Sequence, residues 1–99
     1  MYNTGGAWYI HWPVEMCARA IELGLPLAAV DAMYGNQQTV RTPTHNGRID
    51  AIGRIASTAW AVWLEVEPVV DMNTRTLIVT GLTVITEADL AQVWAAAGR

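Results

Sequence analysis

The side chains that most often carry chemistry are few in this sequence. They are one cysteine, Cys17, one serine, Ser57, and two histidines, His11 and His45. Cys17 falls in an apolar stretch, where a thiol is usually an inert part of the core. His11 stands between two apolar residues, which is typical of a buried, hydrogen-bonded ring, whereas His45 falls in a polar turn. These residues predict neither a nucleophile nor a general base.

Spacings that hold metal ions or phosphates are also missing. No C-x-x-C arrangement occurs, no two of the His and Cys residues stand at i, i+4, and the three or four clustered donors that a metal site needs are missing. Gly5 and Gly6 neither follow a strand pattern nor precede a lysine, as a phosphate-binding loop requires. Glu65 and Glu67 share one face of a predicted strand, where a solvated face is a commoner arrangement than a catalytic carboxylate pair. We therefore expect no enzyme, no metal site and no cofactor.

Composition predicts one domain over residues 1–99, since a chain of this length forms a single core. The apolar fraction is 53% and the charged fraction 15%, which favours a packed core plus a buried interface with a partner. A homo-oligomer is the expected state. The alternative is that the five tryptophans simply fill a small core.

Charge and cysteine content limit the partners and the compartment. The net charge is −3 and there is no lysine, so nucleic acid is disfavoured as a partner. A single cysteine fits a reducing cytoplasm, and no leader or membrane-spanning stretch is apparent. Many alanines and arginines without lysine or phenylalanine indicate a GC-rich bacterial or phage genome. We expect a protein of phage or mobile-element type in the bacterial cytoplasm or on a virion, and no membrane partner.

Residues 47–66 are predicted to form the central hairpin of the fold. From Trp60 to Glu67 the even positions are apolar, which is typical of a half-buried strand that places Trp63 and the glutamates on the other face. Ile49 to Ile55 form the preceding strand, in which Gly53 predicts a bulge or sharp bend. The connecting loop falls at residues 56–59.

Helices are predicted on both sides of this region. Residues 1–12 form an aromatic arm or edge strand, residues 13–35 a helical segment, and residues 87–97 a C-terminal helix. The first helix begins at Pro13 and ends at Gly24, and its predicted inward stripe consists of Val14, Cys17, Ala18 and Ile21. The second covers residues 27–34, with Leu27, Val30 and Tyr34 inward. Thr86 and Asp89 predict a capping box for the last helix.

Short strands and turns fill the rest of residues 39–85. Thr39–Thr42 is a candidate strand, and Asn46-Gly47 a tight turn. Pro68 is expected to limit its strand, and residues 71–74 to form a turn. Two further strands are predicted at 77–80 and 82–85, separated by Gly81.

The stretch VRTPTHNGRIDAI resembles the start of small SH3-like barrels, in which a V-x-T-P-like strand precedes a glycine turn and a G-x-I strand. This resemblance implies an α+β fold with a strongly bent antiparallel sheet or barrel, N-terminal helices and a C-terminal helix. The layout is also similar to the type II trimethoprim-resistant dihydrofolate reductases. Leu77-Ile78-Val79 stand where that family has its substrate-binding Val-Gln-Ile-Tyr, so no functional residue carries over.

Residues 16–35 resemble a helix-turn-helix, with Ala20, Gly24, Leu25, Val30 and Met33 at the positions of its small, turn and apolar residues. The second helix lacks the basic and amide side chains that such proteins present to DNA. Two helices packed on a sheet are therefore the preferred interpretation.

The main functional hypothesis is a small, non-enzymatic, self-associating protein-interaction module, such as an accessory virion protein or an inhibitor of host defence. Its contact residues would be Trp8, Tyr9, Trp12 and Trp63. A second hypothesis is an oligomeric barrel that binds or converts a small molecule at Trp60 or Trp63, with Arg41 or Arg48 orienting it. A third is nucleic-acid binding through Arg41, Arg48 and Arg54 or through the helix-turn-helix-like segment.

Overall fold

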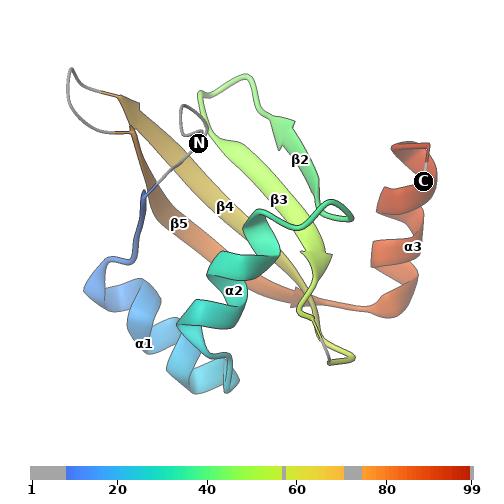
Figure 1. Ribbon diagram of the computed structural model, residues 1–99, viewed down its shortest axis with the longest axis horizontal. Helices are drawn as coiled ribbons and strands as arrows, with labels where there is room; N and C mark the ends of the chain where they lie inside the picture. The colour runs from blue at the N-terminus through green and yellow to red at the C-terminus, as the bar shows by residue number, and fades with distance from the viewer. Residues whose placement is uncertain (1–8, 57, 71–74, 99) are drawn as a thin grey trace, which may run out of the picture.

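The computed structural model describes residues 9–56, 58–70 and 75–98, which form three helices and one five-stranded sheet. The elements follow in the order β1 (Tyr9–His11), α1 (Val14–Leu23), α2 (Leu27–Tyr34), β2 (Val40–Pro43), β3 (Ile49–Arg54), β4 (Ala61–Val70), β5 (Arg75–Ile85) and α3 (Glu87–Ala96). Figure 1 shows α1 and α2 next to each other, with α3 at the opposite end of the molecule. The predicted α+β class is confirmed.

The sheet is open, and the predicted SH3-like barrel is wrong. Its strand order is β1-β5-β4-β3-β2, with β1 parallel to β5 and the other pairs antiparallel. The β3–β4 register runs unbroken from the pair Ile49–Val66 to the pair Arg54–Ala61, so Gly53 introduces no bulge. The one register shift lies in the β4–β5 pair, where Thr80 is an extra residue opposite Glu65. A single bulge does not curl five strands until the edges meet.

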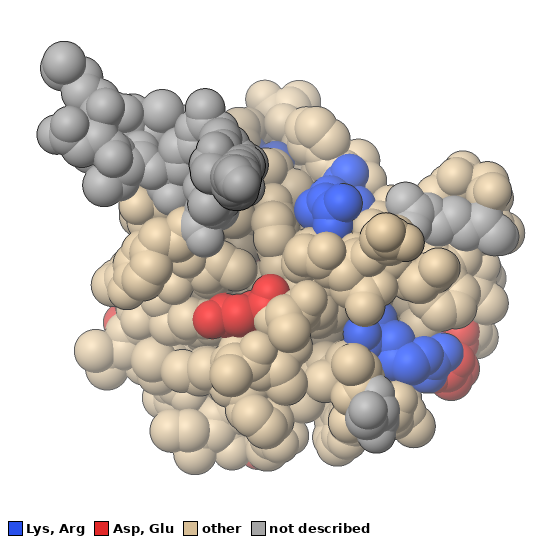
Figure 2. Space-filling model, viewed as in Figure 1, with Lys and Arg blue, Asp and Glu red and all other residues tan. Residues whose placement is uncertain are grey.

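The main core lies between one face of the sheet and helices α1 and α2. It contains alternate residues of the two long strands, with α1 packed against β5 and α2 against β3. Its members include Ala20, Val30, Met33, Ala51, Val62, Leu64, Val66, Leu77 and Val79. Charged side chains are scattered over the molecular face on which α2 lies (Figure 2) and do not gather into a patch there. Because α1 packs against β5 and α2 against β3, these two helices cover the apolar sheet face that a barrel would have enclosed.

Helix α1 faces the core with a different stripe from the predicted one. Val14 is 82% exposed and Ile21 77%, whereas Ala20 is fully buried. Met16 and Leu23, on the same side as Ala20, pack against the core. The Arg19 Nε donates a hydrogen bond to the Leu82 carbonyl at 3.1 Å, which fixes the rotation of the helix relative to β5. The second predicted helix is confirmed, with Val30 buried and Leu27 and Tyr34 packed against the core.

Strand β4 starts later and ends later than its pattern predicts. Trp60 lies before β4 and is 44% exposed, so it is not one of the inward residues. Pro68 does not stop the strand, which continues to Val70 in register with β5. The β3 partner of β4 begins at Ile49, opposite Val66, so β4 has a neighbour on one side only at Pro68. A proline is tolerated there because its missing N–H can face the unpaired side.

Several local signals are confirmed. Gly24 ends α1 in the left-handed conformation with φ 72°, and Gly47 occupies the predicted β2–β3 turn with φ 84°. Thr86 and Asp89 form the predicted capping box of α3.

The predicted strands at 77–80 and 82–85 are one strand, β5, which continues through Gly81. Trp8, Ser57 and the predicted turn at 71–74 lie outside the described residues.

Candidate functional site

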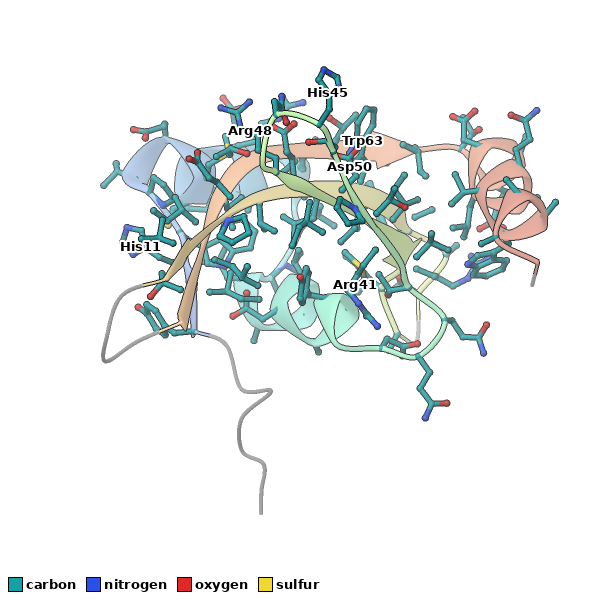
Figure 3. All side chains as sticks on the ribbon, turned by 90° about the horizontal axis from the view of Figure 1, so that it is seen from above. His11, Arg41, His45, Arg48, Asp50 and Trp63 are labelled. Atoms are coloured by element: carbon teal, nitrogen blue, oxygen red, sulfur yellow. The ribbon has the colours of Figure 1, made fainter. Side chains whose placement is uncertain are left out.

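The candidate site lies on the sheet face opposite α1 and α2. Strand alternation places Asp50 and Ile52 of β3, and Trp63, Glu65 and Glu67 of β4, on this open face. Figure 3 shows Arg48, Asp50 and Trp63 on the side of the sheet away from α2, while Arg41 lies on the side of α2. The open face thus combines an aromatic ring with carboxylates.

Trp63 is the large aromatic residue at the centre of this face. It pairs with Ile52 of β3 on one side and with Thr83 of β5 on the other, and it remains 41% exposed. The predicted placement of Trp63 on the same face as Glu65 is confirmed by the register. A ring flanked by two neighbouring strands presents a partly apolar surface to the solvent.

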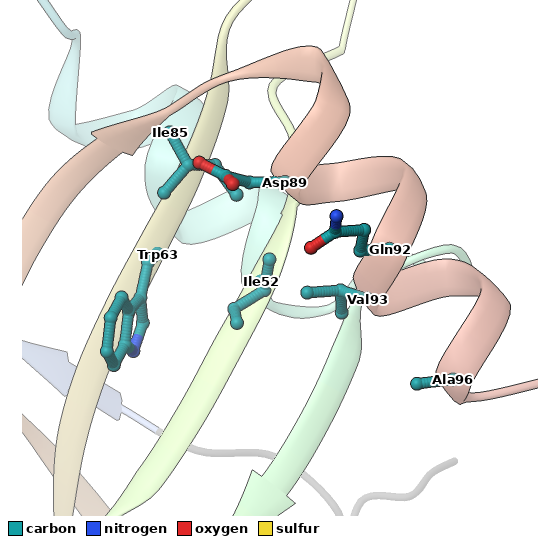
Figure 4. Close-up of a pocket in the computed structure, with 7 residues that line it drawn as sticks. All are labelled: Ile52, Trp63, Ile85, Asp89, Gln92, Val93 and Ala96. Atoms are coloured by element: carbon teal, nitrogen blue, oxygen red, sulfur yellow. The ribbon is translucent and has the colours of Figure 1, made fainter.

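A groove runs between Trp63 and the last helix, and we call it the α3 groove (Figure 4). Its volume is about 460 Å³, and its lining residues are Ile52, Trp63, Ile85, Asp89, Gln92, Val93 and Ala96. Figure 4 shows Ile52 of β3 and Val93 of α3 pointing toward each other, with Trp63 on the neighbouring strand β4. Most of this lining is apolar, so the groove suits aliphatic or aromatic groups.

A second hollow, which we call the acidic hollow, has a volume of about 210 Å³ and is lined by Trp63, Glu65, Gly81 and Thr83. The Glu65 Oε1 accepts a hydrogen bond from the Thr80 hydroxyl at 2.9 Å, so the bulged residue of β5 orients this carboxylate. A Cβ placed on Gly81 would lie 3.4 Å from both the Cβ and the Oε1 of Glu65. The glycine therefore keeps the hollow open next to the carboxylate.

Negative charge predominates around the acidic hollow. Asp50 lies directly opposite Glu65 in the β3–β4 pair, and the buried Asp50 Oδ1 has no hydrogen-bond partner among the described residues. The Arg48 guanidinium is 3.8 Å from Glu65 and 3.9 Å from Glu67. One arginine is thus shared by two of three neighbouring carboxylates, which leaves this part of the face acidic.

The predicted aromatic arm is divided by the structure. Tyr9 lies on the edge strand β1 and is 66% exposed, and its ring centroid is 6.5 Å from that of His11. The Trp12 Nε1 donates a hydrogen bond to the Asp31 Oδ1 at 2.8 Å, so this indole ties the start of α1 to α2. Trp12 therefore packs within the domain, whereas Tyr9 is exposed to the solvent.

The predicted basic residues do not converge. The Arg41 Nη1 donates to the Tyr34 carbonyl at 2.7 Å, at the end of α2, and its guanidinium lies 5.8 Å from the Tyr34 ring centroid. Burial raises the pKa of the Tyr34 hydroxyl, and the nearby Arg41 charge acts in the opposite direction. Arg54 pairs with Glu87, and Trp60 lines neither hollow. Arg41 is therefore apart from Arg48 and Trp63, which share the open face, and a ligand site at Trp60 or Trp63 stays a prediction.

Residues suited to catalysis or metal binding are also apart. The Cys17 thiol donates to the Trp12 carbonyl at 3.6 Å and is half-buried. Within residues 9–56, 58–70 and 75–98, no three His, Cys, Asp or Glu side chains lie close enough to hold a metal ion. No helix in the same ranges is long and apolar enough to cross a membrane.

The ion pair between Arg54 of β3 and Glu87 of α3 fixes one end of the helix that walls the groove. The Arg54 Nη2 lies 2.7 Å from the Glu87 Oε1, and the guanidinium is 5.7 Å from the Trp94 ring centroid. The Trp94 Nε1 in turn donates to the Gln38 carbonyl at 2.9 Å. Helix α3 is thereby held by polar contacts to β3 at its first turn and to the segment before β2 at its last turn.

This pair predicts a pH dependence of stability. The hydrogen bond from Arg54 lowers the pKa of Glu87 below its ordinary value of 4.5. The Arg54–Glu87 pair therefore contributes fully to the free energy of unfolding above about pH 4.5. This contribution is lost as the pH falls through the lower pKa that Glu87 has in the folded state. Glu87→Gln should remove this part of the acid sensitivity, measured by urea unfolding from pH 7 to pH 3. Arg54→Gln should remove the same part, and an unchanged slope in either variant would contradict the pairing.

Sequence reasoning placed Trp63 and Glu65 on one strand face but missed the wall that α3 contributes to the groove. Asp89, Gln92 and Ala96 gave no signal beyond a helix end and its surface, because their role depends on where α3 packs.

Comparison of the chain with protein-family models, with curated proteins and with solved structures finds no match.

Proposed function

We propose that this protein is a small, non-enzymatic interaction module that binds another protein through the open face of its sheet, with Trp63 as the anchor. The observation that carries the proposal is the position of Trp63, half-exposed between two hollows on the face that α1 and α2 leave uncovered. Tryptophan is enriched among the residues that dominate binding energy, especially next to pockets. Polar groups around it, such as Glu65 and Asp89, match the rim of a protein interface.

Charge supports a protein partner other than a second copy at this face. Asp50, Glu65 and Glu67 lie on the same face as the anchor, and the two glutamates share Arg48. Nucleic acid would be repelled by these carboxylates. A second copy that docked by the same face would bring like charges together, which is unfavourable at an interface. Self-association therefore stays a prediction from composition, to be tested by the mass of the protein in solution.

The experiment compares two tryptophans of similar exposure. Trp63→Ala removes the anchor, and Trp60→Ala removes an indole that lines neither hollow. A partner is isolated from a lysate of the organism that carries the gene, purified, and titrated calorimetrically against both variants. Trp63→Ala should weaken binding about 30-fold, as expected for a hot-spot residue worth about 2 kcal/mol. Trp60→Ala should bind like the unmodified protein.

Circular dichroism of both variants establishes that they are folded before binding is compared. If folded Trp63→Ala binds the purified partner with unchanged affinity, the open face is not the docking surface and the proposal is wrong. The same applies if Trp60→Ala causes the larger loss.

A second candidate function is the binding of a small apolar molecule. The α3 groove, at about 460 Å³, falls within the usual size range of ligand pockets. A thermal-shift screen with nucleotides, pterins and antibiotics tests it. Stabilisation that disappears in Trp63→Ala would support a ligand site, and no stabilisation by any compound would remove the reason to consider it.

A further inference from the structure

The two hollows beside Trp63 differ in chemistry although they share the indole as a wall. On one side the α3 groove offers Ile52, Ile85 and Val93 to an apolar group. On the other side the acidic hollow offers the carboxylate of Glu65 and the hydroxyl of Thr83. A ligand that fills both must therefore be apolar at one end and polar at the other.

The acidic hollow selects a cation. A guanidinium or ammonium group placed there would meet the Glu65 carboxylate and the Trp63 ring together, and both interactions favour positive charge. Among the described residues that line the hollow, none is basic. The nearby Arg48 is shared between Glu65 and Glu67 at distances close to 4 Å, so it does not saturate either carboxylate. An anionic group would be repelled by the Glu65 carboxylate and would find only the Thr83 hydroxyl as a side-chain donor in this lining.

The α3 groove selects an apolar side chain of moderate size. Its volume of about 460 Å³ exceeds that of the acidic hollow, about 210 Å³, and its sheet-side lining is aliphatic or aromatic. Asp89 and Gln92 are the polar residues of its helical wall. Burying an aliphatic or aromatic side chain there is favourable because the groove removes apolar surface from water on both partners.

We propose that the partner presents a segment in which an apolar side chain and an arginine or lysine side chain straddle Trp63. The apolar residue enters the α3 groove and the basic residue enters the acidic hollow. In an extended segment, residues i and i+2 point to the same side about 6.5 Å apart. One indole separates the two hollows, so this spacing predicts a three-residue recognition pattern in the partner. The pattern has an apolar residue at one end, a basic residue at the other and any residue between them, in either chain direction. The inference rests on the proposed function, because both use the same face.

The test begins with a phage-displayed library of random peptides selected on the full-length chain. Selected peptides should be enriched in the pattern of an apolar and a basic residue two positions apart. Synthetic versions are then titrated against the unmodified protein, Glu65→Gln and Glu67→Gln. Glu67 is the matched control, because it lies on the same strand and contacts the same arginine but lines neither hollow.

Glu65→Gln should weaken binding of a basic peptide about tenfold, the size of one well-placed charge pair at an interface. It should leave binding of the same peptide with its arginine replaced by glutamine unchanged. Glu67→Gln should have a smaller effect on the basic peptide. Gly81→Ala, whose new methyl group would lie against Glu65, should also weaken the basic peptide more than the neutral one.

The outcomes separate this inference from the proposed function. Selected peptides that lose binding in Trp63→Ala but carry no basic residue, or do not respond to Glu65→Gln, would overturn the inference and leave the docking face intact. Peptides that bind Trp63→Ala as tightly as the unmodified protein would overturn both. A selection that enriches no peptide would likewise count against both.

Discussion

Ala20→Asp is expected to destabilise the protein strongly at neutral pH, whereas Ala18→Asp, two residues earlier, should change its stability little. Ala20 is fully buried in the core cluster, and Ala18 is exposed on the same helix. A carboxylate at position 20 would be buried without a partner, a change that costs about 4 kcal/mol or more. Small domains are stable by roughly 5–15 kcal/mol, so a loss of this size removes between about a quarter and most of that stability.

The two substitutions share the lower helix propensity of aspartate, about 0.6 kcal/mol, so their difference isolates burial. Circular dichroism and urea unfolding of both variants measure it. The pair also tests the rotation of α1. If Ala18→Asp were the disruptive change and Ala20→Asp were tolerated, the stripe containing Val14 and Ile21 would face the core, in contradiction to the structure.

Helix α1 shows why periodicity alone does not fix which face is buried. Apolar residues occur on two sides of this helix, one with Met16, Ala20 and Leu23, and one with Val14 and Ile21. Either side satisfies an amphipathic pattern. The choice is made by contacts distant in sequence, including the hydrogen bond from Arg19 to the Leu82 carbonyl. The helix ends were predictable because Pro13 and Gly24 are local signals.

Strands were more predictable than their arrangement. Alternation at Val62, Leu64 and Val66 identifies a half-buried strand without any tertiary information. Closure of a sheet depends on which edges meet and on what covers its apolar face, and neither is encoded by alternation. Here α1 and α2 cover that face, and β1 adds in parallel at an edge. The prediction of an antiparallel barrel from short strands and glycines was therefore wrong, because it left out these contacts between residues distant in the sequence.

The candidate site was predictable in part for the same reason. Trp63 and Glu65 share a face because they are two residues apart on one strand, and the structure places them there. The α3 groove needs a helix from the end of the chain to lie beside Ile52 and Trp63, which no local pattern indicates. The register shift at Thr80, which orients Glu65, also depends on pairing between strands.

Gly53→Ala is the other substitution with a large expected effect on stability. A Cβ on Gly53 would lie 2.6 Å from the Thr39 Oγ1 and 3.2 Å from both the Thr39 Cβ and the Met33 Sδ. Thr39 is buried and its hydroxyl donates to the Met33 carbonyl, so the side chain cannot rotate away without losing that bond. Overpacking of this kind costs about 3 kcal/mol. For a chain of this size the midpoint of thermal unfolding should fall on the order of 15 °C.

Gly81→Ala is the matched control, because it places the same methyl group on a strand glycine where the nearest atoms of Glu65 are 3.4 Å away. Its thermal midpoint should change much less than that of Gly53→Ala. In the background of Thr39→Ala, which removes the closest atom, Gly53→Ala should cost at least about 1 kcal/mol less than it does alone. Equal costs in both backgrounds would mean that Gly53 is required for a reason other than contact with Thr39.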